Sequence, residues 1–171
     1  MFSKADIEKY FIAEKQLGLI GLLIGIALLL TAASFFIFLK TSFYKGAAIP
    51  LALVAILLIT AGFVIYTRSD KDRIRIVYAY DMNPSELKEK ELPRIKKVIK
   101  NFAVFRFIEI FLIVTGLFLF LYFRNNDDHF FWKGLGITLA IMALFLFTVD
   151  TTAGKRAQIY ANGIESFLLK R

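Results

Sequence analysis

The sequence predicts an all-α integral membrane protein in which four transmembrane helices form a bundle. Four apolar runs are each close to the ~20 residues that a helix needs to cross the hydrocarbon core of a bilayer. The 171-residue chain is 58% hydrophobic, as expected of a small membrane domain, and its basic residues gather in alternate segments between the runs. We expect one domain, residues 1–171, with spans at 17–39, 46–67, 102–123 and 131–150, a cytoplasmic linker at 68–101 and a cytoplasmic tail at 151–171.

The composition excludes several kinds of chemistry. The chain has no cysteine, which excludes disulfides, thiol redox chemistry and thiolate metal sites. Its one histidine, His129, excludes a haem held between two imidazoles of one chain. Asp127 and Asp128 precede this histidine, but three consecutive residues without other partners seldom bind a metal, so we interpret them as a solvated turn. We therefore predict no catalytic residues, no metal site and no cofactor.

The distribution of positive charge predicts the orientation. Seventeen Lys and Arg residues lie in the N-terminal segment, the linker and the tail, against four in the two short loops. By the positive-inside rule, both termini and the linker are cytoplasmic. This arrangement accounts for the net charge of +8 without a nucleic-acid partner. Small size and short loops favour the inner (plasma) membrane of a bacterium.

The first span carries small residues on one face, and two of them form a GxxxG step. Such residues let helices approach closely in lipid, where packing holds helices together. We interpret this face as a contact within the chain, with a contact to another subunit as the alternative. A cleaved signal peptide competes for this segment, but three acidic residues precede the span and the run continues to Leu39, so we expect a permanent helix. The small residues are Gly18, Gly21, Gly25 and Ala32.

The second and fourth spans resemble each other in sequence. Residues 43–52 and 131–140 share six identities in ten, including an aromatic-Lys-Gly motif at the start of each span. The same offset carried to Arg68 and Arg156 gives ten identities in twenty-six. These matches predict two parallel copies of a helical hairpin, related by an axis along the membrane normal.

The linker between the hairpins carries helix signals. Asn83 before Pro84, with Glu86 following, predicts a helix that begins at Pro84 with a capping box. We expect Pro93 to break or kink this helix. Residues 73–80 alternate like a strand, but a lone strand has no partner, so we expect the second helix to continue through them.

A basic face precedes the third span and lies opposite an apolar stripe. This amphipathic lead-in predicts contact with anionic lipid headgroups at the cytoplasmic surface. The tail keeps a helical stripe that either extends the fourth helix or lies along the membrane. The basic residues are Arg94, Lys96, Lys97 and Lys100.

Three charged residues in or near the spans are candidates for a functional cluster. Arg106 and Glu109 are three residues apart on one face of the third span, and Asp150 lies at a similar depth in the fourth. An intramembrane carboxylate is costly unless it is paired or hydrated, so the cluster either binds a cation or proton or forms a polar clasp. In the structural alternative, Arg106 reaches the headgroups and Glu109 pairs with it.

Two classes of function follow from these observations. The first is a non-enzymatic structural, assembly or regulatory subunit with a cytoplasmic docking surface, in a homo-oligomer or a larger membrane complex. The second is a small oligomeric transporter or channel for a cation or a proton-coupled substrate, which would use Glu109 and Asp150. An enzyme ranks third because the chain carries no nucleophile with its base and no cluster of catalytic residues.

Overall fold

The computed structural model describes residues 2–169, apart from the side chain of Asp127, and nearly all of them are helical. It confirms the predicted all-helical class and the four long apolar helices, each of which is long and apolar enough to cross a membrane. These are features of a multi-pass membrane protein. The elements, in chain order, are α1 (Lys4–Ser34), the π-helical turn η1 (Phe35–Leu39), α2 (Ser42–Met82), the short α3 (Pro84–Glu86), the π-helical turn η2 (Leu87–Glu91), α4 (Leu92–Phe123), the 3₁₀ turn η3 (Asp127–His129) and α5 (Phe130–Leu168).

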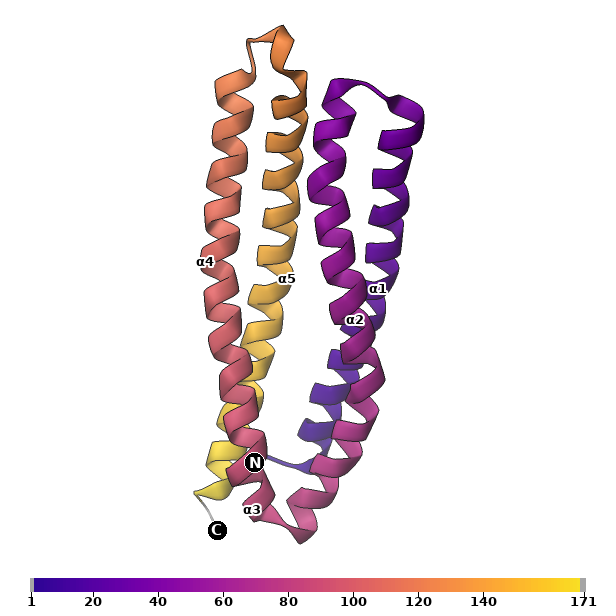
Figure 1. Cartoon of the computed structure of the whole chain (residues 1–171). Coiled ribbons are helices and arrows are strands. Elements are labelled where there is room, and N and C mark those ends of the chain that lie inside the picture. The colour runs from indigo at the N-terminus through magenta and orange to yellow at the C-terminus, as the bar shows by residue number, and fades with distance from the viewer. Residues whose placement is uncertain (1, 170–171) are drawn as a thin grey trace.

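The four long helices form two antiparallel hairpins that stand side by side (Figure 1). Helices α1 and α2 pack against each other, as do α4 and α5, and the hairpins meet through α2 and α5. Both ends of the chain lie at the same end of the molecule, which we call the terminal end, and the two short connections lie at the opposite, loop end (Figure 1). Helix α2 continues through residues 73–80, as predicted.

The linker is helical from Pro84, as predicted, but its start is stabilised differently. The Asn83 side chain does not cap the helix, and it accepts a hydrogen bond from Ser85 Oγ at 2.5 Å. Glu86 reaches across to Arg75 of α2, with 3.5 Å between Oε1 and Nη1. The predicted capping box is therefore wrong, because the glutamate has a cationic partner on the neighbouring helix.

Pro93 does not break the helix. It lies in the first turn of α4, directly after the π-helical turn at 87–91. Proline lacks an N–H group and removes one bond from the helical ladder. The wider turn just before it shifts the hydrogen-bonding pattern, and the helical turns continue from η2 into α4.

The first hairpin closes through small residues that are seven positions apart on α1. A Cβ on Gly18 would lie 3.0 Å from the carbonyl oxygen of Gly62 in α2, and Gly25 is equally close to the α2 backbone. Ala32 is buried in the same interface. A spacing of seven keeps residues on one face of two helices that coil around each other. Gly21, by contrast, has no atom of α2 nearer than 3.9 Å to a Cβ position, so the GxxxG step is not the contact.

The two hairpins make backbone contact near the loop end. A Cβ built on Gly46 would overlap the carbonyl oxygen of Phe131, and one built on Gly134 would overlap the carbonyl oxygen of Phe43. The contact is reciprocal, and only glycine leaves room for it. It fixes the approach of α2 to α5 at this end of the molecule.

At the terminal end the helices extend well past the predicted spans and share an apolar core. Residues from α1, α2, α4, α5 and η2 contribute to it, so the linker and the tail are parts of one packed unit. Phe2 packs on Gly163, and the Tyr80 hydroxyl donates a hydrogen bond to the Phe2 carbonyl oxygen at 3.1 Å. The buried members are Ile7, Phe11, Ile76, Ala79, Leu87, Ile95, Ala157, Tyr160, Ala161 and Ile164.

Candidate functional site

Two carboxyl groups meet inside the second hairpin. Glu109 of α4 is only 5% exposed, and its carboxyl lies close enough to the Asp150 carboxyl on α5 for the two groups to interact electrostatically. The Glu109 Oε2 atom is buried without a hydrogen-bond partner, and so is the hydroxyl of the adjacent Thr151. Two carboxyl groups share a hydrogen bond only when one of them is protonated, so the pair can hold a proton or, when ionised, a cation.

The third member of the predicted cluster has a different partner. Arg106 Nε donates to the carbonyl oxygen of Phe102 in its own helix at 3.4 Å. Within residues 2–169, no ion pair joins Arg106 to Glu109. Glu109 is thus turned toward Asp150 of α5 and forms no ion pair with Arg106, and the structural alternative, in which Arg106 reaches the headgroups, stays a prediction. Those same residues contain no group of three or more His, Asp or Glu side chains arranged to hold a metal.

The basic face before the third span is smaller than predicted. Arg94 turns inward, and Lys96 pairs with Glu165 of α5 at 2.6 Å. Lys97 and Lys100 remain exposed. A helical stripe shows on which side of a helix a residue lies, whereas a buried acid on the preceding turn determines where the long Arg94 side chain points.

That acid is Glu91, which sequence reasoning missed. Its side chain is 0% exposed and accepts two hydrogen bonds from Arg94, at 2.8 and 2.7 Å. The Tyr160 hydroxyl of α5 donates to Glu91 Oε1 at 3.2 Å. Burial and the nearby Glu91 charge raise the pKa of Tyr160, so its hydroxyl keeps the proton that it donates. The only sequence signal was the Glu-to-Arg spacing of three, which is common on solvated helices.

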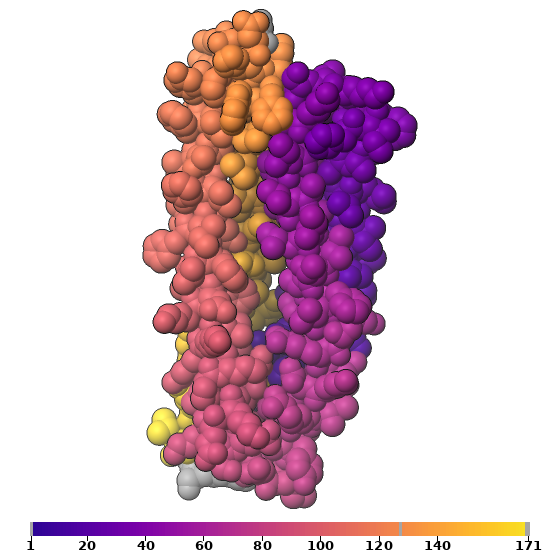
Figure 2. All heavy atoms as spheres, in the orientation of Figure 1, coloured from indigo at the N-terminus to yellow at the C-terminus, as the bar shows by residue number. Residues whose placement is uncertain are grey.

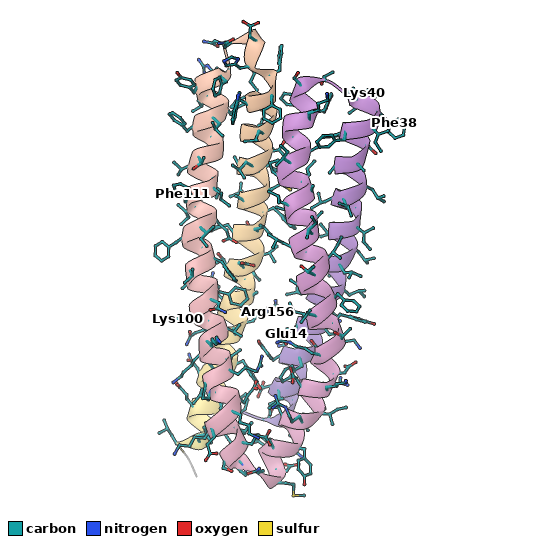
Figure 3. All side chains as sticks on the ribbon, viewed as in Figure 1. Glu14, Phe38, Lys40, Lys100, Phe111 and Arg156 are labelled. Carbon is teal, nitrogen blue, oxygen red and sulfur yellow. The ribbon has the colours of Figure 1, made fainter. Side chains whose placement is uncertain are left out.

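An open groove separates α1 from α5 at the terminal end. It has a volume of about 620 Å³ and a floor formed by the stacked rings of Tyr10 and Tyr160, whose centroids are 4.1 Å apart. A smaller cavity of about 70 Å³ adjoins it and shares Tyr10 and Arg156. Figure 2 shows a small gap between the two hairpins near the middle of the molecule, and Figure 3 shows Glu14 and Arg156 near the space between the hairpins.

Comparison with known proteins leaves the site to be interpreted from its geometry alone. No protein-family model matches the chain, and neither a curated protein nor a solved structure has significant similarity to it.

Proposed function

We propose that this chain is a non-enzymatic subunit of a membrane assembly, structural or regulatory in role, which docks a partner through its cytoplasmic helices. The observation that carries the proposal is an apolar stripe on α2, defined by Ile74, Tyr78 and Met82. These side chains are 66%, 64% and 72% exposed. They lie about 10 to 22 Å past the end of the second span, at 1.5 Å per residue, so lipid chains do not cover them. An apolar surface left in water favours a protein partner.

The proposed orientation places the terminal end in the cytoplasm. It rests on the excess of Lys and Arg in the segments at that end over those in the two short loops. We propose the inner membrane of a bacterium as the location, since the chain is small and its connections are short.

We also infer that the two hairpins are copies of one ancestral hairpin. The reciprocal contacts of Gly46 with Phe131 and of Gly134 with Phe43 support this inference. The two glycines are equivalent in the predicted repeat, and so are the two phenylalanines. A twofold axis between copies makes equivalent residues exchange contacts in this way. Such an axis would run along the membrane normal.

The spacing of the α2 stripe favours an amphipathic partner helix. Ile74, Tyr78 and Met82 follow each other at intervals of four and so share one face of α2. Apolar anchors at i, i+4 and i+8 match the face of a second helix laid alongside. The terminal-end core is already filled by the chain itself, so the stripe is free for an occupant from outside. The proposed occupant of the stripe is a helix of another subunit.

Replacing both Ile74 and Tyr78 with serine is expected to remove the partner. The protein would be extracted from native membranes in mild detergent, and the mass of the intact complex measured. The wild type should carry a stoichiometric partner, and the double variant should have the mass of the chain alone. The fold should be retained, because both side chains are exposed.

Ile159→Ser serves as the matched control for this experiment. Ile159 is 72% exposed at the same end of the molecule but lies on α5. It should leave the mass of the complex unchanged. If the double variant keeps the partner, docking does not use the stripe. An added mass equal to that of the chain itself would identify a second copy as the occupant.

The Glu109 and Asp150 pair favours a second candidate function, in which the protein conducts protons or cations as an oligomer. A buried carboxyl beside a half-buried one, with one oxygen unpartnered, forms a site that could accept and release a proton. Intramembrane carboxylates of this kind often lie on ion pathways. The pair could equally hold α4 to α5 as a polar clasp.

Conduction through this pair predicts that Glu109→Gln and Asp150→Asn each abolish proton flux. The flux would be followed with a pH-sensitive dye in vesicles containing the purified protein, after a jump in external pH. Thr115→Val is the control, since the Thr115 hydroxyl only donates to the Phe111 carbonyl of its own helix. Unchanged flux with reduced stability in the two carboxyl variants would leave the clasp as the explanation.

A further inference from the structure

Two basic side chains, Arg156 and Lys9, line the groove between α1 and α5. Arg156 and Lys9 form no ion pair with any residue from 2 to 169, and Arg156 Nε is buried without a hydrogen bond. A guanidinium that has lost part of its hydration gains strongly from an anion that accepts its hydrogen bonds. One acidic side chain, Asp6, also lines the groove and its charge acts on Lys9, so among the described residues it is Arg156 that has no acidic partner there.

In the first hairpin, the arginine equivalent to Arg156 forms ion pairs with acidic side chains. Arg68 is equivalent to Arg156 in the predicted repeat, and it pairs with Glu14 at 3.4 Å and with Asp72 at 3.9 Å. Aligning Thr31 of the first span with Thr115 of the third places Val98 opposite Glu14, and the offset that pairs Arg68 with Arg156 pairs Asp72 with Tyr160. The arginine is thus kept in the second hairpin while both of its acidic partners are replaced.

The two cavities beside Arg156 differ in polarity and in distance from the spans. The smaller one is lined by Leu17, Ile65 and Phe102, which lie at the ends of the proposed spans. The larger one extends away from the spans toward Ser166. Arg156 lies where the two meet, about 9 Å beyond the fourth span at 1.5 Å per residue, which is close to the depth of lipid headgroups.

We propose that this groove binds the phosphate-bearing headgroup of an anionic lipid from the cytoplasmic leaflet. Arg156 and Lys9 contact the phosphate, and the headgroup occupies the larger cavity above the stacked Tyr10 and Tyr160 rings. The small cavity forms an apolar neck toward the acyl chains. This site is separate from the α2 docking stripe, and it rests on the proposed function only for the orientation in the membrane.

Two acidic groups belong to the surroundings of the site: Asp6 lines the larger cavity and its charge acts on Lys9, and Glu14 lines the smaller cavity. Asp6 accepts hydrogen bonds from the backbone N–H and hydroxyl of Ser3, at 2.9 and 2.8 Å. Glu14 pairs with Arg68, and burial raises its pKa, which weakens its repulsion of an anion. Its Oε2 atom faces the small cavity without a partner, so a water could bridge it to Arg156. The experiment must distinguish such a bridge from lipid binding.

The test is native mass spectrometry of the full-length protein in detergent during titration with phosphatidylglycerol. One phosphatidylglycerol should bind tightly, and phosphatidylcholine should bind much more weakly. Arg156→Gln should lower the affinity by about tenfold, as expected for the loss of charge-assisted hydrogen bonds. Lys9→Gln should lower it as well, and its exposed position makes misfolding a poor explanation. Lys97→Gln, an exposed lysine on α4, is the control and should have no effect.

Glu14→Gln separates the two roles of Arg156. If lipid binds there, this variant should raise the affinity, because it removes a negative charge near the phosphate. If Arg156 is only water-bridged to Glu14, both Glu14→Gln and Arg156→Gln should lower the thermal stability and leave lipid binding unchanged, which would overturn the proposal. Equal binding of the two lipids, or equally strong binding of inorganic phosphate alone, would overturn it too. None of these outcomes depends on the α2 stripe, so the docking function is tested separately.

Discussion

Gly46→Ala is expected to lower the free energy of unfolding by about 2 to 3 kcal/mol, the cost of overpacking at a tight contact. The new Cβ would occupy the position of the Phe131 carbonyl oxygen. Both partners are helix backbone, so no side chain can move aside to make room. The helices α2 and α5 must separate near the loop end, and the hairpins lose their closest contact. Gly134→Ala should lower the free energy of unfolding by a similar amount, since Gly134 contacts Phe43 in the same way.

Gly21→Ala provides the matched control. Its Cβ would lie 3.9 Å from the nearest atoms of α2, an ordinary van der Waals distance. We expect little change, or a gain of up to about 1 kcal/mol from helix propensity. Unfolding in sodium dodecyl sulfate can be followed by the fluorescence of Trp132, the only tryptophan, which lies near this contact. Equal stability of both variants would mean that the hairpins do not touch at Gly46.

Glu91→Ala is expected to destabilise the terminal end by about 3 to 5 kcal/mol, the usual cost of breaking a buried ion pair by removing one partner. The substitution leaves the largely buried Arg94 without its two hydrogen bonds and removes the acceptor of the Tyr160 hydroxyl. Hydrogen–deuterium exchange should report faster exchange in residues 84–101 and in the facing part of α5. The spans themselves should keep their protection, since this network lies outside them.

Two further variants establish that the buried charge causes this effect. Glu89→Ala removes an exposed glutamate two residues away and should leave exchange unchanged. Glu91→Gln keeps an oxygen that accepts hydrogen bonds but removes the charge, so its effect should be intermediate. If hydrogen–deuterium exchange in residues 84–101 is the same in Glu91→Ala and Glu89→Ala, the hydrogen bonds of Glu91 do not hold the linker to α5.

Sequence reasoning succeeded where a local pattern decides the structure. The four helices follow from apolar runs long enough to span a bilayer, in which the backbone must satisfy its own hydrogen bonds. The helix start at Pro84 and the continuation of α2 to Met82 follow from local signals as well. Predictions of side-chain contacts failed where a side chain can reach more than one partner. Glu86 was assigned to its own helix start but pairs with Arg75 of α2.

The candidate site was predicted only in part. Glu109 and Asp150 were singled out because charge is rare in an apolar span, and the structure brings them together. Their contact could not be derived, because it depends on how far α4 and α5 are rotated about their axes. The burial of Glu91 could not be predicted from the sequence, because it lies in a stretch where acidic and basic residues alternate and most of them are exposed.

By itself the sequence determined the four helices and their apolar character, because these depend on neighbours along the chain. Only the tertiary structure decided which polar groups meet. Glu91 and Tyr160 are 69 positions apart, and a helix turns about 100° per residue, so a small change in register or rotation would place a different side chain opposite each of them. The backbone approach at Gly46 and Gly134 sets how the two hairpins meet, and the shared core at the terminal end positions the residues around the groove.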